Sequence, residues 1–169
     1  NDVSIGMRKQ VIWALGACHA DSLAPALKDS SRTVVMRGLR DGEADVRVGA
    51  VLALRELGVG GALDEVIALA ADPSADVRYL IAQLLEQLAS GAYRRALGDL
   101  PQETRDRVAI ALMGLLGDSA QSIRTHAMRG LGQSGYTRAI AALKPLSASG
   151  TEEDKTESAT ALARLQAAN

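Results

Sequence analysis

One cysteine and two histidines are the side chains of this sequence best suited to nucleophilic or metal chemistry. Cys18 and His19 are adjacent and Asp21 follows, so a nucleophile, its base and an orienting carboxylate stand close together. The segment falls at the expected end of a helix, however, and nothing beside it resembles an oxyanion hole. We therefore expect a packed cysteine, a histidine on the helix dipole and no catalytic residue.

The other motifs that could support chemistry are also incomplete. His126 follows His19 by 107 residues, and a zinc site needs three or four Cys or His ligands, so we expect no metal and no cofactor. The glycine segments 58–61 and 130–132 follow no strand and precede no Lys-Ser or Lys-Thr pair. They indicate a helix stop and a close helix contact. Acidic clusters such as Asp41, Glu43 and Asp45 favour turn capping over acid–base catalysis.

The composition predicts closely packed helices. Ala and Leu supply 30 and 23 of the 169 residues, and the chain has one Trp, three Tyr and no Phe. A β-sandwich or barrel would need Val, Ile, Thr and aromatic residues instead. Small side chains bring backbones close together, which antiparallel helices tolerate well.

The charge and the cysteine content restrict the partners and the compartment. Nineteen basic and 20 acidic residues give a net charge of −1, so binding to nucleic acid phosphates is not expected. No apolar run is long enough to span a membrane. One cysteine suits a reducing compartment, and we expect a cytoplasmic location. The sequence starts at Asn1, so we expect a piece of a longer chain.

One spacing recurs six times along the chain. An Asp is followed five residues later by an aliphatic residue, then by Arg, then by small or aliphatic residues at helical offsets. Asp41-Val46-Arg47 and Asp72-Val77-Arg78 are the clearest copies. The others start at Asp2, Asp99 and Asp118, and in a degenerate last copy Ser149 and Lys155 replace Asp and Arg.

The offsets place the small residues on one face of a helix, with the Asp in the turn before it. An Arg in the first turn is unfavourable for its own helix dipole, unless it reaches an Asp of its own or the adjacent turn. We expect a structural Asp–Arg ladder, and we favour it over a groove that grips phosphates. Its members are Asp41, Arg47, Asp72, Arg78, Asp99, Arg105, Asp118 and Arg124.

Shorter amphipathic segments lie between most copies, at residues 63–70 and 140–146. With the turn Asp, the Val-Arg pair and the run from Ala50 to Leu54, the chain resembles the HEAT-repeat family, in particular its short bacterial form related to phycobilin-lyase repeats. The resemblance implies an all-α fold, a right-handed α-solenoid of stacked antiparallel helix pairs. It covers residues 1–169 as a single repeat domain.

The distances between copies vary, and they predict about eleven helices. The 39 residues from Arg8 to Arg47 have room for two short helices, near residues 23–28 and 33–40. A squeezed helix is expected near residues 93–97. The 19 residues from Arg105 to Arg124 leave no room for one, so helices 102–117 and 120–133 should be direct neighbours. Thr151 to Asp154 resemble a capping box that opens the last helix.

The outward positions of the motif helices carry more apolar residues than a solvated surface should. We expect this ridge to bind another protein, with Arg55, Glu86 and Arg129 at its polar rim; coverage by further helices is the alternative. The partner-binding residues would be Trp13, Val48, Leu52, Arg55, Tyr79, Glu86, Ile110, Met113 and Arg129.

The sequence thus favours a non-enzymatic protein-interaction module or scaffold. The resemblance leaves two alternatives open. One is an accessory protein in chromophore or cofactor attachment, similar to phycobilin lyases. The less favoured one is a DNA-binding protein similar to the HEAT-like alkylpurine DNA glycosylases, because Trp13 is the only Trp and no basic excess exists.

Overall fold

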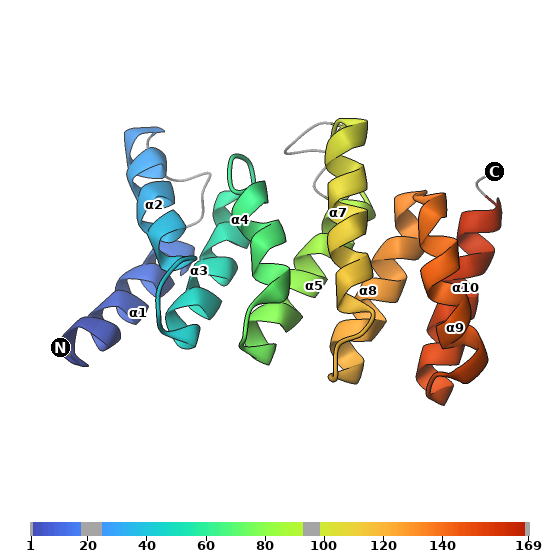
Figure 1. The fold of residues 1–169 in the computed structure, drawn as a ribbon. Coiled ribbons are helices and arrows are strands. Elements are labelled where there is room, and N and C mark those ends of the chain that lie inside the picture. The colour runs from blue at the N-terminus through green and yellow to red at the C-terminus, as the bar shows by residue number, and fades with distance from the viewer. Residues whose placement is uncertain (1, 18–24, 93–98, 168–169) are drawn as a thin grey trace. The chain divides into compact units, whose positions relative to one another are not determined.

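The computed structural model describes residues 2–17, 25–92 and 99–167, and in these ranges all regular structure is helical. Figure 1 shows the helices, which pack side by side within each of the chain's two compact units. They are α1 (Asp2–Ala17), α2 (Pro25–Gly38), α3 (Ala44–Leu57), α4 (Leu63–Ala68), α5 (Ala75–Ala89), α7 (Gln102–Leu115), α8 (Gln121–Ser134), α9 (Ile140–Ser149) and α10 (Glu152–Ala167). Two 3₁₀ turns, Leu69–Ala71 and Thr137–Ala139, follow α4 and precede α9. The predicted all-α fold class is confirmed.

The chain forms two compact units, Asn1–Leu80 and Ile81–Asn169, and the boundary falls inside α5. In the first unit α3 packs against α1 and α2. Small residues make this approach possible, because a Cβ added to Gly49 would lie 3.3 Å from Cγ2 of Ile12. Aliphatic side chains such as Val35, Val46 and Leu54 are fully buried, and each contributes about 1.5–3 kcal/mol by leaving water.

In the second unit α8 packs against α7 and α10, and α10 packs against α9. A Cβ on Gly130 would lie 2.8 Å from Cδ1 of Leu112 and 3.1 Å from the Cα of Glu86. A Cβ on Gly132 would lie 2.8 Å from the Cα of Ala161. The interpretation of residues 130–132 as a close helix contact is therefore confirmed, as is the direct packing of α7 on α8.

The prediction of two short helices between residues 23 and 40 is wrong, because α2 runs without a break from Pro25 to Gly38. The polar residues between the two expected helices are accommodated inside this one helix. Ser31 is buried, and the Thr33 hydroxyl donates a hydrogen bond to the Asp29 carbonyl one turn earlier, at 3.0 Å. The helix expected at residues 93–97 lies outside the described residues. The described residues form nine α-helices.

The ends of the helices follow the turn chemistry of the sequence. Gly58 ends α3 with φ 86° and Gly135 ends α8 with φ 70°, a backbone region that favours glycine. At the start of α10 the Thr151 N–H donates to Oδ2 of Asp154, and the Asp154 N–H donates to the Thr151 hydroxyl, both at 3.1 Å. This is a reciprocal capping box, with Asp in the place of Glu, and it confirms the predicted helix start.

Candidate functional site

The buried arginine of α3 joins two successive turns. Nε and Nη2 of Arg47 donate to the two carboxylate oxygens of Asp72, at 2.7 and 2.8 Å. Its Nη1 donates backward to the carbonyls of Asp41 and Gly42, at 2.8 and 3.0 Å. The hydrogen bonds to Asp72 raise the pKa of Arg47. This guanidinium therefore satisfies its own turn and the next one together.

The same geometry recurs at α1. Arg8 donates through Nε and Nη2 to both oxygens of Asp41, at 2.7 and 3.0 Å. Oδ1 of Asp41 also accepts the Glu43 N–H, and Oδ1 of Asp72 accepts the Ser74 N–H in the equivalent turn. The hydrogen bond from Arg8, together with that from Glu43, lowers the pKa of Asp41. Each turn carboxylate thus holds its own turn and receives an arginine from an earlier helix.

In the second unit, the acceptor for Arg124 is a residue that the repeat spacing did not identify. Nε and Nη2 of Arg124 each donate to Asp154, both at 3.0 Å, while Nη1 donates to the Asp118 carbonyl at 2.8 Å. The motif placed Ser149 at the acceptor position, but the carboxylate comes from the first turn of α10. Hydrogen bonds from Arg124, and then from Gln121 and Thr151, hold the pKa of Asp154 well below its usual range.

The copy of the motif that begins at Asp99 differs from the three arginine–carboxylate pairs described above. Arg105 is exposed and donates to the Leu100 carbonyl at 3.1 Å and to the side chain of Gln102. At Gly130, α8 lies directly against Glu86 of α5, so α7 does not stand between α5 and α8 as a successive copy would. Helix α7 carries the spacing of the motif, but Leu112 of α7 and Glu86 of α5 both lie against Gly130 of α8.

Arg78, like Arg47, donates to the carbonyls of the turn before its own helix. Its Nη1 donates to the carbonyls of Asp72 and Pro73, at 2.9 and 3.1 Å. Oδ1 of Asp118 accepts the Ala120 N–H at 2.9 Å, as the other turn carboxylates do. These hydrogen bonds stabilise the turns before α5 and α8.

The residues first considered for chemistry do not assemble in the described part of the chain. Cys18, His19 and Asp21 lie outside the described residues. Nδ1 of His126 lies 2.6 Å from Oε2 of Glu86, within hydrogen-bond distance. No group of His, Cys, Asp and Glu within the described ranges could hold a metal ion. None of the described helices combines the length and the apolarity that crossing a membrane requires.

The predicted partner-binding residues of the first unit include two large exposed side chains. Trp13 is 74% exposed on α1, and Leu52 is 42% exposed on α3, the helix packed beside it. Val48, Arg55 and Tyr79 are half-buried. We call the surface formed by Trp13, Val48, Leu52 and Arg55 the α1–α3 face. It combines an indole, aliphatic groups and a cation.

In the second unit the corresponding positions are occupied by ion pairs. Arg129 on α8 donates to Glu157 on α10 at 3.1 and 2.5 Å, and Glu86 on α5 pairs with His126. The hydrogen bond to Glu157 raises the pKa of Arg129 and lowers that of Glu157. Glu86 and Arg129, expected at a polar rim, are therefore bonded within the unit.

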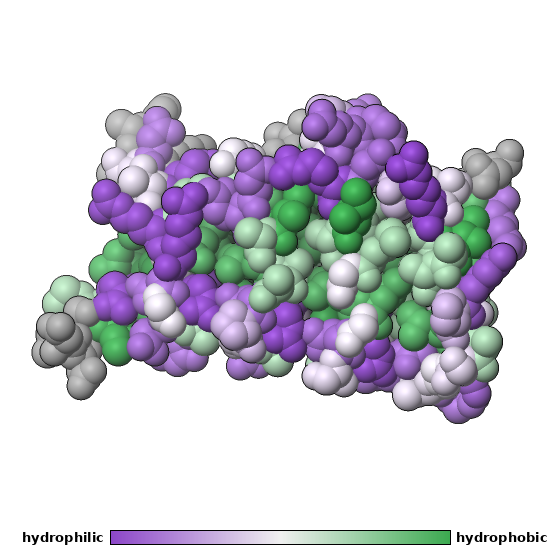
Figure 2. All heavy atoms as spheres, in the orientation of Figure 1, coloured by the Kyte–Doolittle hydropathy of each residue, from purple (hydrophilic) through white to green (hydrophobic). Residues whose placement is uncertain are grey.

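The remaining two predicted residues lie on α7. Ile110 is 56% exposed and Met113 is half-buried. Figure 2 shows hydrophobic residues on the viewed face over α7 and its neighbours in the second unit, bordered by hydrophilic ones.

The sequence pattern missed a hollow in the first unit. Met7 and Val11 occupy motif positions expected to face a neighbouring helix, yet they are 59% and 44% exposed. They line a hollow of about 330 Å³ between α1 and α2. The arginines of α2 provided a signal, since Arg32, Arg37 and Arg40 fall within nine residues, but the sequence predicted two separate helices there.

Comparisons with known proteins identify the fold and no family. No family model and no curated protein matches the chain. A designed armadillo repeat protein solved in complex with the peptide (KR)4 superposes with TM-score 0.64 and 18% identity, over 91% of this chain and 72% of that one. Two engineered proteins superpose with TM-scores 0.61 and 0.60, each at 20% identity, over 83% and 80% of this chain.

The chain spans 64% and 38% of the length of those two engineered proteins. At these identities the likeness concerns the fold alone. Together with the stacked helices it shows an all-α helical repeat of the α-solenoid type.

Proposed function

We propose that the chain is a HEAT-type repeat module without catalytic activity that binds another protein through the α1–α3 face. The observation that carries this proposal is Trp13, which is 74% exposed on α1, a helix that packs against α3. Trp and Arg are the residue types that contribute most often to protein–protein binding energy. An indole left in water beside exposed Leu52 is a surface suited to burial against a partner.

The polar residue of this face supports the same proposal. Arg55 is half-buried and forms no hydrogen bond or ion pair with the described residues, so its guanidinium remains available to a carboxylate or carbonyl of a partner. The neighbouring charges are already matched, because Lys9 of α1 pairs with Asp45 of α3. A partner would therefore meet apolar groups with one unsatisfied cation.

The comparison with the designed armadillo repeat protein adds independent support. That protein was solved with a peptide bound, which is compatible with helical repeats of this fold serving as binding scaffolds. The single cysteine of the present chain suits a module of a reducing compartment such as the cytoplasm.

Affinity capture with matched variants tests the proposal. We expect Trp13→Ala and Leu52→Glu each to weaken capture of the partner about 30-fold, the effect of losing about 2 kcal/mol at a central contact. Ile110→Glu changes a residue of α7 whose exposure, 56%, lies between those of Leu52 and Trp13, and it should leave that capture unchanged. Helical circular dichroism should be the same for all four proteins.

Two results would contradict the proposal. If Trp13→Ala and Leu52→Glu both lose their helical signal, these residues support the fold instead of a partner. If neither variant changes what is captured, the α1–α3 face is not the binding surface. Salt-sensitive binding to duplex DNA, or a pigment that copurifies with the chain, would favour the two alternatives that the HEAT resemblance leaves open.

A further inference from the structure

The hollow between α1 and α2 has an apolar wall that is open to solvent. Met7 and Val11 on α1 contribute large exposed side chains, and Val34 on α2 is half-buried. Ile12 forms the floor, because its side chain packs against Gly38 and Gly49 and is 3% exposed. The hollow is lined by Met7, Arg8, Val11, Ile12, Val34, Arg37, Gly38 and Asp41, and we call it the α1–α2 groove.

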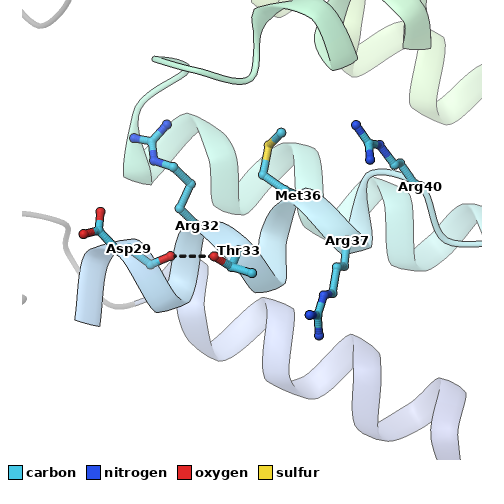
Figure 3. A pocket seen from close by; sticks show the side chains of 6 residues that line it. All are labelled: Asp29, Arg32, Thr33, Met36, Arg37 and Arg40. Atoms are coloured by element: carbon cyan, nitrogen blue, oxygen red, sulfur yellow. Dashed lines mark hydrogen bonds between the residues drawn. The ribbon is translucent and has the colours of Figure 1, made fainter. Parts of the chain in front are cut away.

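Only one charge of the α1–α2 groove is left without a counterion. Arg8 and Asp41 neutralise each other through two hydrogen bonds, at 2.7 and 3.0 Å. Arg37 is exposed and forms no hydrogen bond or ion pair with any residue that the structure describes. Figure 3 shows its guanidinium extended toward α1, that is, toward the groove. The groove therefore presents an apolar wall and a single unmatched cation.

The outer surface of α2 extends this positive charge. Arg32, Met36 and Arg40 point away from α1 in Figure 3 and line a second hollow of about 560 Å³, to which Arg37 also belongs. Arg40 is paired with Glu65 at 2.5 Å. Nη1 of Arg32 is buried and has no hydrogen-bond partner among the described residues. Asp29 is the one acidic side chain that lines this hollow, against three arginines.

We propose that the α1–α2 groove binds an acidic amphipathic helix of a partner protein, with its apolar side chains between Met7, Val11 and Val34 and a carboxylate on Arg37. Helices commonly dock into apolar grooves through side chains three and four residues apart, and the flexible Met7 adapts to different shapes. The charge selects the partner, because a basic helix would place cations beside Arg37 and the other arginines of α2. This surface differs from the α1–α3 face, since Trp13 does not line the groove.

Two labelled peptides test the chemistry of this site. Each has about 15 residues and the same Leu positions at helical spacing, with Glu at the flanking positions of one peptide and Lys in the other. By fluorescence anisotropy the native chain should bind the Glu peptide saturably and more weakly as salt rises, and the Lys peptide should not bind. Arg37→Glu should lower the affinity for the Glu peptide at least about fivefold and should allow the Lys peptide to bind.

Further variants separate the wall of the groove from its charge. Val11→Ser should weaken binding of the Glu peptide and leave the preference for Glu over Lys unchanged. Arg55→Glu, which reverses an unpaired cation outside the groove, should change neither the affinity for the Glu peptide nor this preference. Equal binding of both peptides, no binding of either, or an unchanged preference in Arg37→Glu would overturn the proposal. Trp13→Ala should leave peptide binding intact, so failure here is distinguishable from failure of the α1–α3 face.

A second copy of the chain is the competing occupant. Sedimentation velocity of the native chain and of Val11→Glu decides this point. We expect both proteins to sediment as the same species. A native dimer that Val11→Glu converts to a monomer would show that the groove is an interface between copies, and would overturn the proposal.

Discussion

At the scale of single residues, Asp154 joins several parts of the second unit. Its carboxylate accepts from Arg124 and Gln121 and caps α10 through Thr151, and it is 3% exposed. We expect Asp154→Ala to lower the free energy of unfolding by about 3 kcal/mol, because it leaves a largely buried guanidinium without its partner. Urea denaturation followed by circular dichroism measures this loss.

Lys155→Ala serves as the matched control for that measurement. Lys155 is the next residue of α10, and its ion pair with Glu152 is exposed to solvent. The free energy of unfolding should change by no more than about 0.5 kcal/mol. Equal losses in Asp154→Ala and Lys155→Ala would mean that the buried pair adds nothing to the stability of the fold.

The same carboxylate predicts a dependence of stability on pH. Because the pKa of Asp154 is lowered in the folded chain, the unfolded chain binds its proton first as the pH falls. The stabilisation is therefore complete well above the ordinary Asp value of 3.8 and declines as the pH drops below it. We expect the free energy of unfolding of Asp154→Asn to fall less between pH 5 and pH 2 than that of the native chain. Parallel pH profiles would contradict this assignment.

At the scale of helices, Gly132 sets the distance between α8 and α10. Adding a Cβ there would place it 2.8 Å from the Cα of Ala161, a backbone atom that cannot rotate away. We expect Gly132→Ala to destabilise the fold by about 1–3 kcal/mol through this overpacking. Thermal and urea denaturation give the difference.

Gly114 on α7 provides the opposite case within the same unit. Nothing lies within 4 Å of a Cβ at Gly114, and the residue is exposed. Gly114→Ala should raise the free energy of unfolding by about 0.5–1 kcal/mol, since Ala restricts the unfolded chain more than Gly does. If both replacements raised the free energy of unfolding, helix propensity would explain them and the close contact at Gly132 would not matter.

The sequence predicted the helices best where local chemistry decides them. Glycine positions, the Thr151 capping box and the shorter helices predicted at residues 63–70 and 140–146 follow from short-range patterns, and the structure contains them. The motif at Asp99 shows the limit, because the periodicity of a helix records which face is apolar and not which neighbour covers it. For that reason α7 had the spacing of α3 and a different place in the packing.

The candidate site was predicted in part, for a related reason. Trp13 and Leu52 are exposed as the outward positions required, whereas Glu86 and Arg129 are engaged by His126 and Glu157. These pairs link residues 40 and 28 positions apart, and such distances carry no periodic signal. Asp154 was not identified from the sequence because it lies outside the repeated spacing.

At the scale of the whole molecule, helical repeats contact mainly their neighbours, so a local defect should stay local. Asp154 interacts with α8 and the start of α10, far along the chain from α1 and α3. We expect Asp154→Ala to accelerate amide hydrogen exchange most in α8, α9 and α10 and least in the first unit. Hydrogen exchange with mass spectrometry measures this; uniform acceleration along the chain would show that the two units unfold together.

The arginine pairs span unequal lengths of chain. Arg8 and Asp41 are 33 residues apart, Arg124 and Asp154 are 30 apart, and Arg47 and Asp72 are only 25 apart, yet each guanidinium meets its carboxylate in the same bidentate manner. The length of chain between an arginine and its carboxylate can therefore change, provided that the turns themselves are kept. A loop or reporter peptide grafted beyond Gly135, between α8 and α9, should be carried without disturbing the stacking, and this gives protein engineers a place to add new surface.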